Sequence, residues 1–116
     1  MKAEFSDFIE GNYHREVGEI GPCDFDHLLV EARNLGGSGN VTLILTKSEK
    51  DFISIDYVGK NQYLVQSDRL CKTGSFLKRL LQSMNFEATV EGHAGIKNLA
   101  VDYSSLGRRE FESKYS

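Results

Sequence analysis

The sequence predicts an α+β fold in which an antiparallel meander of strands is packed by two to three helices. Three short segments between residues 41 and 67 alternate apolar and polar side chains, the pattern of half-buried strands. Other segments repeat apolar residues every three or four positions, which is typical of amphipathic helices. Short polar turns separate the three strand-like segments, so neighbouring strands are expected to run antiparallel.

The chain length predicts a single domain over residues 1–116. Domains of about 100 to 150 residues are the commonest size, and a chain of 116 residues has no room for a second one. Forty per cent apolar residues, twelve aromatic residues and one proline are enough for a real core and argue against disorder.

The first elements of the chain are expected to be a strand, a loop and a helix. Residues 1–9 predict an edge strand, because Met1, Ala3 and Phe5 alternate with polar residues. Residues 11–22 are interpreted as a loop, or as an irregular strand around residues 13–17. A helix is expected over residues 24–35. Its apolar residues recur at helical spacing and are Phe25, Leu28, Leu29 and Ala32.

The ends of this helix are predicted from its flanking residues. Asp24 stands where an N-cap belongs, since its carboxylate can accept from the first free amides. Gly36 and Gly37 are expected to end the helix, and residues 35–40 to turn into the next strand. A phosphate-binding loop is excluded, because such a loop follows a strand and opens a helix.

The meander strands are expected over residues 41–46, 52–58 and 62–67. Within the second strand, Ile53, Ile55 and Tyr57 are expected to share one face, because side chains alternate along a strand. Further elements follow at helical and strand spacing. They are a helix over 75–84, a strand over 86–90, a helix over 95–104 that buries Ile96, Leu99, Ala100 and Tyr103, and a last turn that aligns Phe111 with Tyr115.

Charge is distributed unevenly along the chain. Residues 1–59 carry five Lys/Arg and eleven Asp/Glu, a net charge of minus six, and residues 60–116 carry nine and six, a net charge of plus three. An acidic first half disfavours binding to nucleic acid and permits steering toward a basic partner. The alternative is an ordinary solvated surface on which the charges happen to be unevenly distributed. No apolar run reaches the roughly 20 residues of a membrane span, and the first residues lack a signal core. The expected location is cytoplasmic.

Fragments that resemble catalytic or metal motifs lack the required geometry. Ser75 and Lys78 match S-x-x-K, and residues 72–74 match KTG, but in serine enzymes these elements come from distant parts of a larger fold. Cys23 and His27 could hold zinc only with more ligands than the neighbouring sequence supplies. His93 is interpreted as a turn histidine. We therefore expect no enzyme activity, no catalytic residue, no metal and no cofactor.

The architecture as a whole resembles a known class of bacterial proteins. The segment FDHLLVEARNLGGSGNVTLILTKSEKDFISIDYVGKNQYLV, then a strand, a glycine-led helix and the ending GRREFESKYS, are similar to small cytoplasmic immunity proteins of contact-dependent growth inhibition and polymorphic toxin systems. The resemblance implies a non-enzymatic inhibitor that binds one cognate toxin domain, such as a basic nuclease, in the producing cell. No binding residue of that class is carried over, because the resemblance lies in architecture, size and acidity.

If helices cover one face of the sheet, the other face is the expected binding surface. Its acidic, amide and apolar side chains would suit the basic cleft of a nuclease. The alternation places there Phe52, Ser54, Asp56, Gln62, Leu64, Gln66, Glu87, Thr89 and Glu91. We predict Phe52, Asp56, Gln62, Glu87 and Glu91 as partner-binding residues. The alternative is that the helix over 75–84 or the N-terminal segment covers this face.

Two other functions remain open from the sequence. A small secretion chaperone or adaptor would bind an unfolded segment of a partner, and it would show an exposed apolar patch and a homodimer. A small enzyme would need a concave pocket with paired titratable groups, which the spacings above do not supply.

Overall fold

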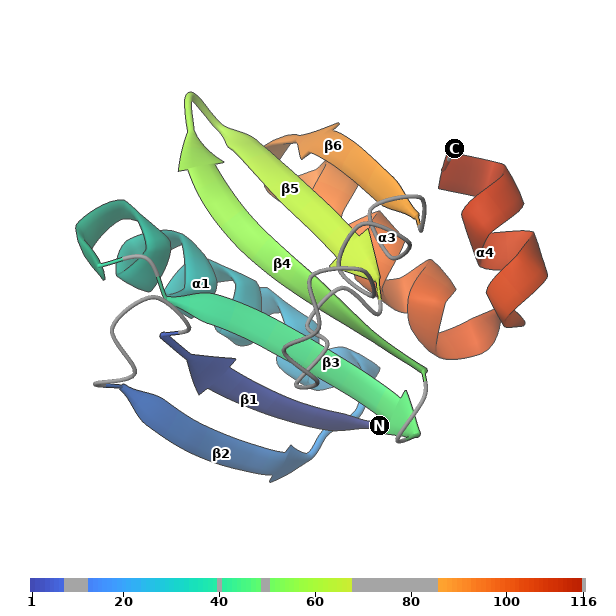
Figure 1. The fold of residues 1–116 in the computed structure, drawn as a ribbon, viewed down its shortest axis with the longest axis horizontal. Helices are drawn as coiled ribbons and strands as arrows, with labels where there is room; N and C mark the ends of the chain where they lie inside the picture. The colour runs from blue at the N-terminus through green and yellow to red at the C-terminus, as the bar shows by residue number, and fades with distance from the viewer. Residues whose placement is uncertain (8–12, 40, 49–50, 68–85, 116) are drawn as a thin grey trace, which may run out of the picture.

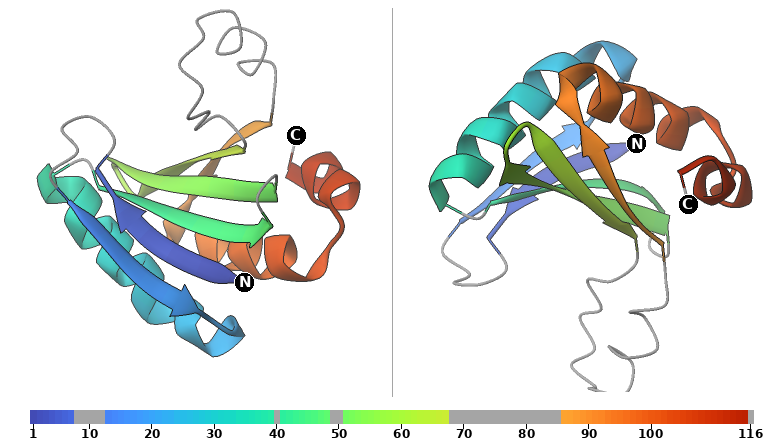
Figure 2. Two further views of the ribbon diagram at one scale, coloured as in Figure 1. Left: turned by 60° about the horizontal axis from the view of Figure 1, so that its bottom comes forward. Right: turned by 90° about the horizontal axis from the view of Figure 1, so that it is seen from above.

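The strands form one antiparallel sheet, and helices α1 and α3 lie on one side of it, with α4 beside the ends of the strands (Figures 1 and 2). The strand order across the sheet is β2-β1-β3-β4-β5-β6. The computed structural model describes residues 1–7, 13–39, 41–48, 51–67 and 86–115. The elements are β1 Lys2–Ser6, β2 His14–Glu19, the 3-10 turn η1 Pro22–Asp24, α1 Phe25–Gly39, β3 Thr42–Ser48, β4 Asp51–Gly59, β5 Gln62–Ser67, β6 Glu87–Glu91, α3 Gly92–Ser105 and α4 Arg108–Tyr115. The predicted α+β class is confirmed.

Strand β1 lies inside the sheet, so its prediction as an edge strand was wrong. It pairs with β2 on one side and with β3 on the other. The alternation along it was predicted correctly, since Ala3 and Phe5 are buried in the core. Alternation reports which face a residue occupies, but neighbours in a sheet are set by pairing between distant segments.

The meander from β3 to β5 has the predicted register. Ile53 and Ile55 are fully buried, and Tyr57 packs against the same core. The turn between β4 and β5 places Lys60 and Asn61 at φ +53° and +61°. Positive φ at both central residues is the type I′ geometry that matches the twist of a hairpin.

Both ends of α1 differ from the prediction. Asp24 is not the N-cap of this helix. It ends the preceding 3-10 turn, and its Oδ2 accepts from the backbone N–H of Gly21 at 2.8 Å. The helix also continues past Gly36 and Gly37 to Gly39. A glycine at position 36 allows the helix to approach the sheet closely, because a Cβ there would lie 3.1 Å from Cβ of Tyr57 on β4.

The C-terminal elements mostly follow the prediction. Helix α3 starts at Gly92, earlier than expected, and buries the four predicted residues Ile96, Leu99, Ala100 and Tyr103. Phe111 on α4 is buried against Phe86 and Tyr103, with ring centroids 5.2 Å away in both cases. The helix expected over 75–84 lies outside the described residues.

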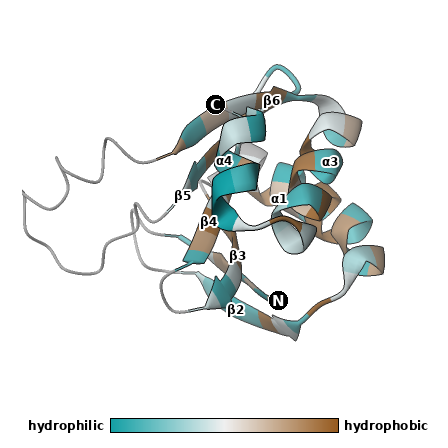
Figure 3. Ribbon diagram, turned by 90° about the vertical axis from the view of Figure 1, so that its right-hand side faces the viewer, coloured by the Kyte–Doolittle hydropathy of each residue, from teal (hydrophilic) through white to brown (hydrophobic). Residues whose placement is uncertain are grey.

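The core lies between the sheet and the layer formed by α1 and α3. Paired residues on successive strands form rows across the inner face, for example Phe5, Leu43, Ile55, Val65 and Ala88. Figure 3 shows hydrophobic positions on the strands and on α3 alternating with hydrophilic ones, as layered packing requires. Among the described helices, none has the length and apolar character to cross a membrane.

Candidate functional site

The face of the sheet opposite α1 and α3 carries an excess of carboxylates, and we name it the acidic face. In Figure 2 both helices lie on the other side of the sheet. Register and alternation assign each strand residue to one face. The ionisable residues that the pairing assigns to the acidic face include six carboxylates, Glu4, Glu16, Glu19, Asp56, Glu87 and Glu91, and one lysine, Lys2.

The centre of the acidic face is apolar and partly buried. Ile44 and Ser54 are paired residues on neighbouring strands, and both are buried. Phe52 and Leu64 flank them and are half-buried. Ile44 lies outside the main core cluster, so this apolar centre is separate from the helix-covered core. An apolar centre with a charged rim is the arrangement of many protein-binding surfaces.

Asp56 sits at the border between this centre and the charged rim. It pairs across the strands with Leu64 and accepts a hydrogen bond from the hydroxyl of Thr42. Burial raises the pKa of the Asp56 carboxyl, and the Thr42 hydrogen bond opposes this only in part. The fold therefore keeps a carboxylate at a position where its ionised form is unfavourable.

All five residues predicted to bind a partner lie on the acidic face. Gln62 and Glu91 are direct cross-strand partners, and Asp56 lies one strand further in. Phe52 is at the other end of β4, roughly 20 Å from the Gln62 end at 3.3 Å per residue. The five residues thus belong to one surface, but they do not converge on one point. Such a surface suits a protein better than a small ligand.

A group that the sequence did not reveal lies on β1 and β2 at the far side of this face. Glu4 and Glu16 are cross-strand partners, and Nε2 of His14 lies 3.8 Å from Oε2 of Glu4 and 4.0 Å from Oε1 of Glu16. The three ligand atoms lie within 4.8 Å of one another, so they could approach a divalent ion. The group is largely exposed. The sequence could have revealed this group only if the pairing of residues 4 and 16 had been known, and alternation alone does not give that pairing.

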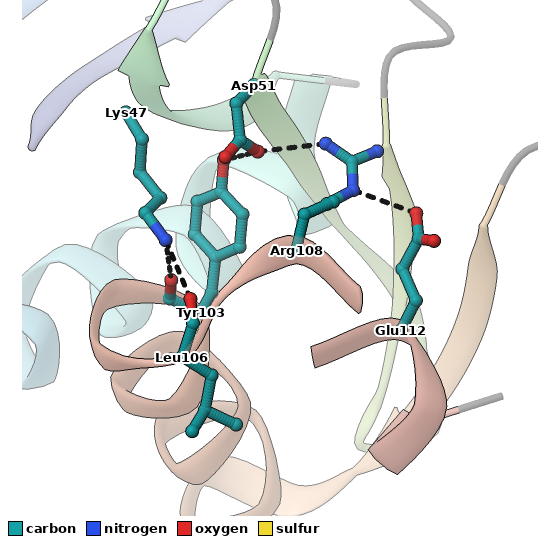
Figure 4. Close-up of polar contacts among 6 residues, drawn as sticks. All are labelled: Lys47, Asp51, Tyr103, Leu106, Arg108 and Glu112. Carbon is teal, nitrogen blue, oxygen red and sulfur yellow. Dashed lines mark hydrogen bonds and ion pairs between the residues drawn. The ribbon is translucent and has the colours of Figure 1, made fainter. Parts of the chain in front are cut away.

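A second polar cluster lies on the helix side and ties β4 to the C-terminal helices (Figure 4). Asp51 accepts from the Tyr103 hydroxyl and from Nη1 of Arg108, both at 2.8 Å, and Nε of Arg108 bonds Glu112 at 2.8 Å. Lys47 donates to the backbone oxygens of Tyr103 and Leu106 at the end of α3, both at 2.9 Å. A lysine at the last carbonyls of a helix complements the helix dipole. We interpret this cluster as structural.

The fragments considered for zinc or acid–base chemistry serve separate roles. Cys23 is exposed, and Asp24 holds the Gly21 amide. Asp26 bonds Nζ of Lys97 at 2.8 Å and Nε2 of His93 at 2.9 Å. Those two hydrogen bonds lower the pKa of Asp26, and the bond from Lys97 has the larger effect.

His93 lies in the first turn of α3, and its hydrogen bond to Asp26 links this helix to α1. This position corrects the interpretation of His93 as a turn histidine. The S-x-x-K and KTG fragments at residues 72–78 lie outside the described residues.

Comparison with known proteins gave no relative: no family model, no curated protein and no solved structure matches this chain. The geometry described above is therefore the basis for the functional inference.

Proposed function

We propose that the protein is a non-enzymatic inhibitor of the immunity type, which binds a basic toxin domain through the acidic face and so neutralises it. The observation that carries this proposal is the charge of that face, where, among the strand residues that the structure describes, six carboxylates accompany Lys2 and His14 around a half-buried apolar centre. A nuclease cleft must attract phosphate and is therefore basic, so this face has the complementary charge.

The role of each residue on such a surface follows from how far its side chain is buried. Exposed carboxylates at the rim, such as Glu87 and Glu91, would speed association by electrostatic steering. Phe52 and Leu64 would supply the desolvated anchors that hold the complex together. Asp56, already partly desolvated, would pair with a cation of the partner, because a cation favours the ionised form that burial disfavours.

The test is calorimetric titration of the purified protein with the product of the gene immediately upstream, because an immunity gene should follow its toxin gene. We expect a one-to-one complex with a nanomolar or lower Kd, the range of tight inhibitor complexes. Absence of binding at micromolar concentrations would contradict the inhibitor proposal. A homodimer on size exclusion that binds an unfolded segment of the partner would instead favour the chaperone or adaptor alternative.

A further inference from the structure

The two edges of the sheet differ in how well they could accept another strand. At one edge, β2 pairs with β1 through an interrupted register between Ala3 and Glu4, and Gly18 has a φ of +94°. A bulge of this kind twists an edge and discourages further pairing. At the other edge, β6 pairs with β5 over five residues without interruption. The regular edge is therefore β6.

The direction of the backbone groups on β6 follows from two hydrogen bonds at its ends. The Ser67 N–H donates to the Phe86 oxygen at 3.2 Å, and the Gly92 N–H donates to the Asn61 oxygen at 2.8 Å. In an antiparallel pair, hydrogen-bonded and non-hydrogen-bonded residues alternate, so Ala88 and Val90 also direct their backbone N–H and carbonyl groups toward β5. Thr89 then directs its N–H and its carbonyl outward, and Glu91 its N–H. Among the described strands, none lies beyond this edge.

The side chains of β6 specify the chemistry of a strand that would fit beside it. Thr89 and Glu91 are exposed on the acidic face, together with Glu87. Ala88 and Val90 lie on the helix-covered face and are only half-buried, and each ends a row of core residues. A strand added here would bury those two residues further. It would place basic side chains beside the glutamates and apolar ones beside Ala88 and Val90.

We propose that the partner adds one β-strand, alternating basic and apolar residues, to the outer edge of β6. This inference deepens the proposed function: the identity of the partner rests on that function, whereas the chemistry of the strand rests on the edge itself. Backbone hydrogen bonds to Thr89 and Glu91 would give affinity, and the alternating side chains would give specificity.

A second copy of this chain is a poor occupant of the same edge. In the antiparallel register that pairs all five residues of β6 with their copies, Glu87 of each chain would face Glu91 of the other. Like charges directly opposite each other are destabilising. The edge therefore disfavours self-association and favours a basic strand.

A synthetic peptide tests the edge without knowledge of the natural partner. The probe is a capped seven-residue peptide of alternating lysine and valine, titrated into the ¹⁵N-labelled full chain. We expect saturable shifts of the Thr89 and Glu91 amides. Two control peptides isolate the cause: one in which glutamate replaces lysine, and one of the same composition with the lysines and valines in separate blocks. Neither control is expected to produce those shifts.

Proline at two edge positions provides the matched variants. Thr89→Pro removes an outward N–H without breaking a bond to β5, a place where edge strands tolerate proline. We expect it to weaken peptide binding about tenfold, since one lost hydrogen bond costs about 1.4 kcal/mol. His14→Pro makes the equivalent change on β2, where the bonds of its neighbours direct the His14 amide outward. It is expected to leave binding unchanged. Glu91→Lys, which leaves the backbone intact, should also weaken binding and covers the case in which Thr89→Pro fails to fold.

Three results would overturn this inference: no shift at millimolar peptide, equal shifts with the block peptide, or shifts centred on β2. Such a result would leave the proposed function standing if calorimetry still shows a nanomolar complex. Conversely, peptide binding at β6 without a complex of the upstream gene product would retain the edge and remove the inhibitor proposal.

Discussion

The two faces of the sheet are made from the same strands but differ in nearly every property. On the helix-covered face, Ile53, Ile55 and Val65 are fully buried beneath α1 and α3. On the acidic face, their immediate neighbours along the chain are half-buried, except for the buried Ser54. Because the side-chain period of a strand is two, one sequence encodes both faces at once.

The difference shows where stability and where binding are encoded. Burial of apolar area drives folding, so the helix-covered face is expected to carry most of the stability. Asp56 on the acidic face has its pKa raised by burial, which is a cost to folding. A residue that opposes folding is more easily explained by interaction with a partner than by packing.

The sharpest contrast between the faces is the cost of removing one apolar side chain from each. We expect Ile53→Ala to lower the free energy of unfolding by about 2 to 5 kcal/mol, because Ile53 is fully buried. Leu64→Ala on the acidic face should cost about 1 kcal/mol, since that side chain is only half-buried. Urea denaturation of both variants measures the difference. Equal losses would mean that the acidic face belongs to the folding core.

The contact between α1 and the sheet sharpens the same comparison. Gly36→Ala places a Cβ 3.1 Å from Cβ of Tyr57, and a central strand cannot easily move away. Overpacking costs about 1 to 3 kcal/mol, whereas alanine in a helix gains about 1 kcal/mol over glycine. We expect a net loss of about 1 kcal/mol by urea denaturation. Gly107→Ala, with open space around it, is the control and should be close to neutral. A stabilised Gly36→Ala variant would refute the close contact.

A smaller effect is expected at the cluster that holds α3 and α4 to β4. Tyr103→Phe keeps the buried ring but removes the hydroxyl that donates to Asp51. Arg108 still neutralises Asp51, so the expected loss is about 0.5 to 1 kcal/mol. Tyr57→Phe removes an exposed hydrogen bond from the Asn61 amide and should change the thermal midpoint less. If Tyr57→Phe proves the more damaging change, the cluster does not hold these helices.

The smallest predicted effect has the opposite sign. Because the pKa of Asp56 is raised in the folded state, stability is greatest with the carboxyl protonated and falls as pH rises through that pKa. Asp56→Asn should therefore raise the thermal midpoint at pH 7, and this gain should vanish below the ordinary pKa of aspartate. Thermal scans at pH 7 and pH 3 measure the change. A variant that is less stable at pH 7 would contradict the burial of the ionised carboxylate.

The sequence predicted the features that depend on local periodicity. The strands of the meander, the buried residues of α3 and the two faces of β4 follow from spacing of 2 and 3.6 residues. The five predicted binding residues share a face for the same reason.

Some errors are local, such as the role of Asp24, whose carboxylate accepts from Gly21, but most errors and omissions involve contacts between distant segments. The interior place of β1 depends on its pairing with β2 and β3. The close approach of α1 to the sheet at Gly36 involves Tyr57, twenty-one residues later in the numbering. The group of Glu4, His14 and Glu16 likewise forms only when two strands pair. No spacing within one segment records such contacts.

The central claim is that the acidic face, not the helix side, receives the partner. The most direct measurement compares the association rate and Kd of two matched charge reversals with the product of the upstream gene. Glu91 lies on the acidic face and Glu110 on α4, and both are exposed. We expect Glu91→Lys to slow association relative to the native protein, and to slow it most at low salt, where charges are least screened. Glu110→Lys is expected to leave the association rate and the Kd unchanged. Equal effects of the two reversals, or a larger effect of Glu110→Lys, would contradict the claim.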